Sequence, residues 1–142
     1  MFEYQYARPA ASVDVIVSRM IDGDEHILLI QRKHDPFQGS WALPGGFLDM
    51  DETLEQAAAR ELKEETCLDA LSVTQIGTFS AVDRDPRSRV ITTAFEVATD
   101  PLQTPVAADD AADWQWKKLD SKIELAFDHA EILNLWKKKR SL

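Results

Sequence analysis

Three glutamates, Glu61, Glu64 and Glu65, are spaced so that one helix would carry them on the same side. The stretch around them contains the alanines 57–59 and lacks Gly and Pro, which favours a helix. At about 100° per residue, the three carboxylates fall on the side of the alanines, which is the side expected to pack inward. Like charges at these spacings destabilise even an exposed helix, and far more when desolvated, unless a cation neutralises them. The pattern therefore predicts a bound metal ion.

The surrounding residues indicate which ion and how it would be held. Oxygen ligands in a tight group suit Mg²⁺ or Mn²⁺ better than Zn²⁺. Arg60 lies one turn before Glu64 and can brace one carboxylate, and Gly45-Gly46 allows the backbone to approach a ligand closely. The alternative is a solvated acidic helix with internal salt bridges, which such a triplet alone usually indicates. Three observations favour a metal site: the glutamates share a helix side with the alanines, Arg60 lies beside them, and a glycine pair precedes the helix.

The stretch from Gly46 to Leu68 resembles the Nudix box. That signature is Gly, five residues, Glu (here Glu52), seven residues, and then a run matched by residues 60–68. All specified positions match except Cys67, where the family has Gly. That Gly is expected to close the helix with a positive φ, which would cost a Cys about 1 kcal/mol. The substitution affects the helix end rather than the acidic residues.

The resemblance implies an α/β/α sandwich with a mixed β-sheet between helices, one domain over residues 1–142, and hydrolysis of a pyrophosphate bond with Mg²⁺ (or Mn²⁺) as cofactor. It implies metal ligands at Gly46, Glu61, Glu64 and Glu65, and catalytic residues at Glu52, Arg60, Glu64 and Glu65. Arg60 would position the glutamates, and Glu52 would pair with Arg60 or touch an outer metal. The general base is left open between Glu64, Glu65 and an acid at Asp109-Asp110.

Three arginines in the turn 83–89, Arg84, Arg87 and Arg89, would make a clamp for phosphate or ribose oxygens. The alternative is a solvated turn. This turn and the stretch 37–46 resemble the ADP-ribose pyrophosphatase branch of the family, which implies ADP-ribose as substrate and AMP and ribose 5-phosphate as products.

Two further residues are candidates for substrate contact. Phe37 could stack on adenine, although a core position is the alternative, and Asp109 could contact substrate or simply solvate its loop. The resemblance is compatible with a homodimer, because ADP-ribose hydrolases of this branch commonly form dimers, but the sequence leaves the oligomeric state open.

Two rival functions remain. One is a house-cleaning hydrolase of nucleoside triphosphates, which would release pyrophosphate. The other is a sensor that binds an ADP-ribose-type nucleotide without turnover. Every acid of the box is present and few residues follow the last expected strand, too few for a DNA-binding winged helix, so an enzyme is favoured.

The composition argues against several classes of protein. The 142 residues carry a formal net charge of -9, which argues against sequence-independent nucleic-acid binding. The basic run 137–140 is better explained as the complement of a helix dipole. One Cys, an N-terminus unlike a signal peptide and the lack of a long apolar run predict a cytoplasmic protein without a membrane span.

The chain alternates expected strands and helices in an order that fits the sandwich. A hairpin is expected around the turn 22–24, a bulge at Gly77, and a last helix with Asp128 and Glu131 as a capping box. The expected strands are 12–21, 25–32, 41–43, 71–82, 89–99 and 114–116.

Overall fold

The computed structural model describes residues 2–108, 111–120 and 122–141, and its strands form two four-stranded sheets. The first sheet has the order β5-β1-β7-β6 and is mixed. In it, β1 runs parallel to β7 and antiparallel to β5, and β6 runs antiparallel to β7. Its strands are β1 (Ala10–Ile16), β5 (Gly45–Phe47), β6 (Ser72–Phe79) and β7 (Val90–Ala98).

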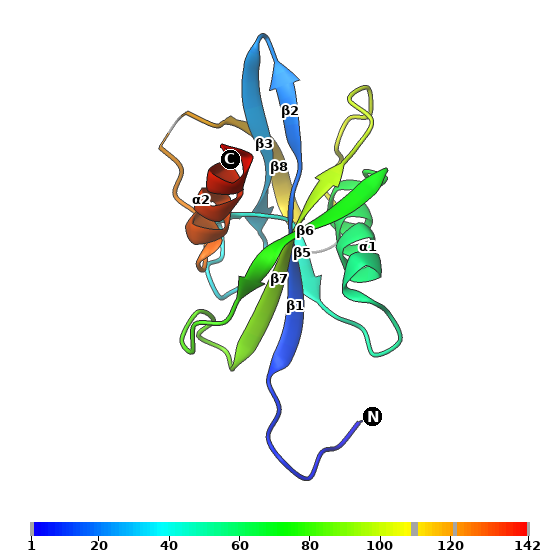
Figure 1. Ribbon diagram of the computed structural model, residues 1–142, viewed down its shortest axis with the longest axis vertical. Helices are drawn as coiled ribbons and strands as arrows, with labels where there is room; N and C mark the ends of the chain where they lie inside the picture. The colour runs from blue at the N-terminus through cyan, green and yellow to red at the C-terminus, as the bar shows by residue number, and fades with distance from the viewer. Residues whose placement is uncertain (1, 109–110, 121, 142) are drawn as a thin grey trace.

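The second sheet is antiparallel and is built on β3. Strands β2 and β4 pair with successive stretches of β3, and β8 pairs with it over residues 26–32. The hairpin β2–β3 extends away from the rest of the molecule, at the top of Figure 1. The strands are β2 (Ser18–Ile21), β3 (Asp24–Arg32), β4 (Trp41–Ala42) and β8 (Ala111–Lys118).

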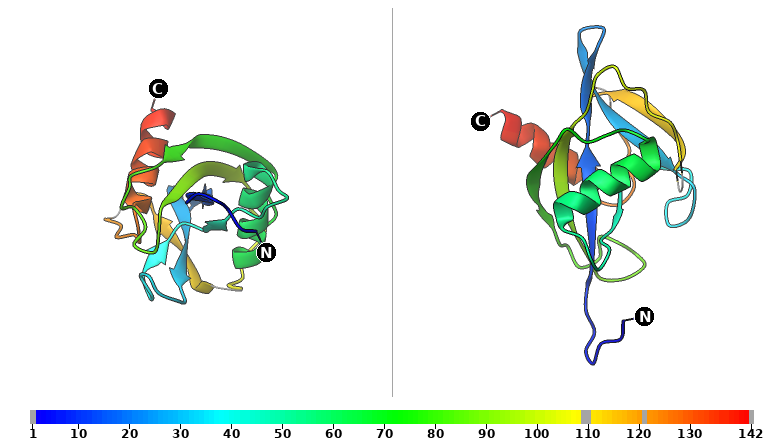
Figure 2. Two further views of the ribbon diagram at one scale, coloured as in Figure 1. Left: turned by 90° about the horizontal axis from the view of Figure 1, so that it is seen from below. Right: turned by 90° about the vertical axis from the view of Figure 1, so that its right-hand side faces the viewer.

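Two helices, α1 (Leu54–Thr66) and α2 (His129–Arg140), lie on opposite sides of the strands (Figures 1 and 2). This arrangement confirms the predicted α/β/α sandwich, with the mixed sheet divided from a second, antiparallel one. Neither of the helices in the described part of the chain is long and apolar enough to cross a membrane.

Strand β1 serves both layers, because its side chains alternate between the two sides. Val13 and Val15 join the core beneath α1, where Leu62 and Phe95 are also fully buried. Ile16 points the other way, into the core beneath α2. The α2 core is completed by Ile27, Leu29, Leu43, Ile76, Ala94, Ile132, Leu133 and Trp136.

Helix α1 has well-formed ends. At its start, the Gln56 N–H donates to Thr53 Oγ1 at 3.2 Å and the Thr53 N–H donates to Gln56 Oε1 at 2.8 Å, which makes a capping box. At its end, Cys67 has φ 63° and ψ 8°, the left-handed conformation that the family's Gly was expected to adopt. Its N–H donates to the Lys63 carbonyl at 2.9 Å.

Most expected strands are confirmed within a few residues, and two local predictions are confirmed in detail. The β2–β3 hairpin turns through Asp22 (φ 52°) and Gly23 (φ 84°), and the β6–β7 register shifts between Gln75 and Gly77. The single strand expected over 12–21 is wrong, since the chain passes there from the first sheet to the second. Period-two alternation continues across that junction and does not reveal it.

The capping box expected at Asp128 is also wrong. Helix α2 does begin after Asp128, but the Asp128 carboxylate makes no cap hydrogen bond there. Instead it accepts two hydrogen bonds from Arg84, a residue that is distant in the sequence.

Candidate metal and substrate site

Two glycines of β5 bring the backbone against α1. A Cβ atom at Gly46 would lie 2.4 Å from the Glu61 carboxyl carbon, and one at Gly45 would lie 2.2 Å from the Val13 carbonyl oxygen. The Gly45 N–H donates to Glu65 Oε2 at 3.0 Å. The absence of a side chain at Gly46 therefore lets the Glu61 carboxylate of α1 approach β5, and its absence at Gly45 lets β5 lie close to β1.

Arg60 hydrogen-bonds three carboxylates at once, and its Nε lies 3.3 Å from a fourth, that of Asp49. Its Nε and Nη2 donate to Glu52 at 2.9 and 2.6 Å, and its Nη1 donates to Glu61 at 2.9 Å and to Glu64 at 3.0 Å. Nη2 also donates to the Phe47 carbonyl at 3.0 Å, which ties α1 to β5. Of the two roles expected for Glu52, the structure places it in the pairing with Arg60.

Burial and hydrogen bonding change the acidity of these groups. The hydrogen bonds from Arg60 lower the pKa of Glu52, and the same contact raises the pKa of Arg60. Burial raises the pKa of Glu61, and the hydrogen bond and charge of Arg60 offset this only in part. Glu61 is therefore a partly desolvated acid whose negative charge is not fully compensated by Arg60.

The donor set fits a hard divalent cation. Carboxylates of Glu61, Glu64 and Glu65 and the Gly46 carbonyl offer only oxygen atoms, the ligands that Mg²⁺ and Mn²⁺ prefer. The described residues contain no ready-made cage of three acid, His or Cys groups. Arg60 draws Glu61 and Glu64 toward itself, while Gly45 holds Glu65. Binding would need the glutamates to turn their other oxygens to the ion.

The acids border a cleft with two parts. A hollow of about 460 Å³ is lined by Glu61 and Glu65 on one side and by residues 33–35 on the other. A narrower hollow, of about 60 Å³, runs on toward α2 and is lined at its far end by Phe127 and His129. The two parts share Ile30, Arg32, Gly45, Phe47 and Arg87 among others, so they are continuous.

Arginines and phenylalanines meet at the narrower part of the cleft. The Phe127 ring lies 4.8 Å from the Phe37 ring, with the guanidinium carbons of Arg32 and Arg87 at 4.9 and 5.7 Å from its centre. Arg87 also lies 5.1 Å from the centre of the Phe47 ring. Both Phe37 and Phe127 have positive φ, at 60° and 54°, a strained conformation that is common at ligand-binding sites.

The three arginines expected to form one clamp have different environments. Arg84 is buried, with 4% of its side chain exposed, and donates to both Asp128 oxygens at 2.9 and 2.7 Å. Arg87 is 43% exposed in its side chain and donates to both Asp85 oxygens at 3.1 and 2.7 Å. Arg89 donates to the Ala81 carbonyl at 3.3 Å.

The structure thus brings together some of the expected substrate residues. Arg87 lines both hollows, whereas Phe37 contacts the Phe127 ring and is not among the described residues that line either hollow. Arg84 lines the cleft only with a guanidinium already engaged by Asp128, and among the described residues that border either hollow Arg89 is absent. Asp109, and Asp110 with it, lie outside the described residues.

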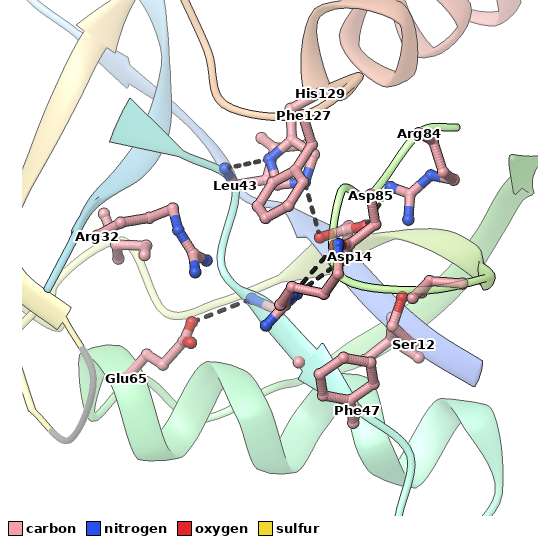
Figure 3. A pocket seen from close by; sticks show the side chains of 16 residues that line it. Ser12, Asp14, Arg32, Leu43, Phe47, Glu65, Arg84, Asp85, Phe127 and His129 are labelled. Atoms are coloured by element: carbon pink, nitrogen blue, oxygen red, sulfur yellow. Dashed lines mark hydrogen bonds and ion pairs between the residues drawn. The ribbon is translucent and has the colours of Figure 1, made fainter. Parts of the chain in front are cut away.

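A buried polar group that sequence reasoning missed lies at the inner end of the cleft (Figure 3). Asp14 accepts a hydrogen bond from Thr92 Oγ1 at 2.7 Å, and His129 Nε2 lies 3.1 Å from its other oxygen. Burial raises the pKa of Asp14, but contacts with His129, Thr92 and Arg84 outweigh it and leave that pKa below its ordinary value. A lone carboxylate between Val13 and Val15 was the available signal.

Known proteins resemble this chain over most of its length. The NUDIX domain family model matches residues 10–136. The ADP-ribose pyrophosphatase of Methanocaldococcus jannaschii is 43% identical over 130 residues, which cover 90% of this chain and 73% of that protein. The ADPR responsive transcriptional repressor NtrR of Acinetobacter baylyi is 33% identical over 132 residues, and this chain spans 53% of its length.

Solved structures share the fold. The NUDIX domain of Shewanella oneidensis NrtR complexed with ADP ribose superposes with a TM-score of 0.87 at 29% identity, covering 95% of this chain and 90% of that one. A bifunctional NMN adenylyltransferase/ADP ribose pyrophosphatase of Francisella tularensis, complexed with AMP and a Mn ion, has a TM-score of 0.78 at 32% identity, covering 96% and 43%. Both sheets and both helices therefore have counterparts of known structure.

Proposed function

This chain belongs to the Nudix family of pyrophosphohydrolases, and from that premise we propose that its substrate is ADP-ribose, cleaved to AMP and ribose 5-phosphate. One observation carries the proposal: Glu61 and Glu65 of α1, Arg32, Arg87, Phe47 and Phe127 line one continuous cleft. Acids for a metal ion, cations for phosphate and rings for a nucleobase are the groups that such a substrate requires. The similarity to the M. jannaschii enzyme supports the choice of ADP-ribose.

A divalent ion, Mg²⁺ or Mn²⁺, would supply the positive charge that a pyrophosphate needs before water can attack it. Glu61, Glu64, Glu65 and the Gly46 carbonyl are the proposed ligands. Arg60 fixes the rotamers of Glu61 and Glu64 by direct hydrogen bonds, at 2.9 and 3.0 Å. The Gly45 N–H holds Glu65 in the same way, so each of these acids is bound through one carboxylate oxygen.

We assign the proton-accepting role to Glu64. Of the two box acids considered for it, Glu65 is 7% exposed and bound by the Gly45 N–H. The Glu64 side chain is 44% exposed, so one of its oxygens can reach a water molecule while the other stays on Arg60. A base must lie within hydrogen-bonding distance of the proton that it removes, which the exposure of the Glu64 side chain permits.

The two ends of the cleft favour one orientation of the substrate. The part toward α2 is lined by Phe47, Phe127 and the apolar Leu43, which suits a nucleobase. The part beside Glu61 is lined by polar residues 33–35, which suit a sugar phosphate. Arg87 lies between them and is proposed to contact the phosphates, in place of the three-arginine clamp.

A second candidate is an ADP-ribose sensor without turnover, because a repressor that responds to ADPR is 33% identical to this chain. One experiment separates the candidates. The purified protein is incubated with ADP-ribose, nucleotide sugars, diadenosine polyphosphates or nucleoside triphosphates, with Mg²⁺ or with EDTA, and the products are resolved by chromatography. AMP and ribose 5-phosphate, formed only with metal, are expected.

The other outcomes identify the rivals. Pyrophosphate released from triphosphates, with ADP-ribose untouched, would identify a triphosphate hydrolase. Tight ADP-ribose binding by calorimetry without any product would identify a sensor. Hydrolysis that persists in EDTA would contradict the proposed metal site.

A further inference from the structure

His129, at the first turn of α2, joins two segments that are distant in the sequence. The Leu43 N–H donates to its Nδ1 at 3.0 Å, and its Nε2 lies 3.1 Å from Asp14 Oδ1 (Figure 3). Because an amide N–H can only donate, Nδ1 is the acceptor and Nε2 carries the proton that is donated to Asp14. The ring is 4% exposed and Asp14 is 6% exposed, so water does not replace either contact.

The segment that His129 holds leads directly to the metal site. Leu43 is followed by Pro44, whose carbonyl accepts from the Val15 N–H at 2.8 Å, and then by Gly45, which pairs with Asp14 between β5 and β1. The Gly45 N–H in turn binds Glu65. A short path of hydrogen bonds and rigid backbone therefore runs from His129 to a proposed metal ligand.

We infer that His129 and Asp14 are positioning residues for the metal site, acting through the backbone of residues 43–46. Both residues line the narrower hollow together with Gly46 and Glu65, and within the described part of the chain neither lines the larger hollow beside Glu61. Their effect is to fix where the Gly45 N–H and the Gly46 carbonyl point. This inference rests on the proposed metal site and not on the identity of the nucleotide.

The burial of the pair supports this role over simple packing. A leucine would fill the His129 position among apolar neighbours without the need to bury a carboxylate. Asp14 instead interrupts a strand whose neighbours are valines, and Thr92 from β7 satisfies its second oxygen at 2.7 Å. Partners that orient a metal ligand from outside the metal's own contacts typically change metal affinity or activity by about 10–100-fold when removed.

The test compares His129→Leu with Asp14→Asn and with the unsubstituted protein. Mn²⁺ affinity is measured by electron paramagnetic resonance in the absence of nucleotide, and kcat and KM are measured with ADP-ribose at saturating metal. For His129→Leu, Mn²⁺ binding about tenfold weaker in the absence of nucleotide is expected, together with a fall in kcat at saturating substrate. Asp14→Asn keeps the shape and an acceptor for Nε2, and should retain more affinity.

The control is Leu135→Ala, also in α2, whose side chain packs near Gly77 and against the same apolar core but makes no hydrogen bond to residues 43–46 in the described part of the chain. It should lower the melting temperature and leave Mn²⁺ affinity unchanged. If His129→Leu behaves like this control, the positioning role is wrong. If the unsubstituted protein binds no Mn²⁺, the proposed metal site fails and the inference with it. If Mn²⁺ binding changes as expected but ADP-ribose is not cleaved, only the substrate assignment is wrong.

Discussion

Arg84 and Asp128 form a buried, two-pronged ion pair that joins the turn before β7 to the start of α2. Arg84 Nε and Nη2 lie 2.9 and 2.7 Å from the two Asp128 oxygens, and 4% and 10% of the two side chains are exposed. Arg84 Nη2 also lies 3.9 Å from Asp14. A guanidinium held in this way positions α2 and the His129 that begins it, and is not available as an open phosphate clamp.

Arg84→Ala should therefore lower the free energy of unfolding more than it weakens substrate binding. Removal of one partner of a buried pair leaves the other charge unpaired, which typically costs about 3–5 kcal/mol. Urea unfolding followed by tryptophan fluorescence measures the loss. The double variant Arg84→Met, Asp128→Leu removes both charges and should recover part of the stability. Unchanged unfolding with a raised KM would return Arg84 to the role of a clamp.

Arg87 is expected to bind substrate. Its side chain is 43% exposed and lies between the rings of Phe47 and Phe127. Arg87→Ala should raise KM for ADP-ribose about tenfold, the effect of one charge-assisted contact, and change kcat less. Arg89→Ala is the matched comparison, because the Arg89 side chain donates to the Ala81 carbonyl and is not among the described residues that line either hollow. Equal KM values for the two variants would contradict the substrate contact proposed for Arg87.

Glu64→Gln should abolish hydrolysis and leave the fold intact. The substitution removes both the proposed base and a metal ligand, yet it also removes repulsion between neighbouring carboxylates. The melting temperature should change by no more than a few degrees, and product formation should fall by at least about a hundredfold. Glu55→Gln, on an exposed position of the same helix, is the control and should keep full activity. Full activity in Glu64→Gln would exclude the assigned role.

Cys67→Gly should stabilise the protein. Cys67 has φ 63°, which costs a residue with a Cβ about 1 kcal/mol relative to Gly. For a domain of this size the melting temperature should rise by about 3–5 °C, as measured by calorimetry. Cys67→Ala keeps the strain and should gain little, so it separates backbone relief from loss of the thiol. A gain shared equally by both variants would show that the thiol, and not φ, is the source.

Local patterns in the sequence predicted the parts of the fold that depend on near neighbours. The helix that carries Glu61, Glu64 and Glu65, the β2–β3 turn and the bulge at Gly77 all follow from spacing and turn chemistry within a few residues. The backbone of Cys67 is a similar case, since its position at the end of a predicted helix already indicated a positive φ.

Features that depend on distant partners were missed. The capping pattern at Asp128 is a correct local motif, but Arg84, brought near by β7, binds that carboxylate instead. No partner for His129 lies at a useful spacing in the sequence, because Asp14 and Leu43 meet it only in the folded chain. Side-chain partners across such separations are set by the tertiary structure, which no periodicity encodes.

The alternating faces of β1 have a consequence for folding fidelity. If β1 paired with β7 one residue out of register, the Asp14 side chain would point into the apolar core beneath α1. A valine would then lie next to His129 in place of Asp14. Such a chain would bury a carboxylate without hydrogen-bond partners, and residues 43–46 would no longer be held in place by the His129–Asp14 pair. The Asp14 carboxylate, which we propose to position the metal site, therefore also specifies the register of β1. A chain with the shifted register would be inactive and too unstable to persist.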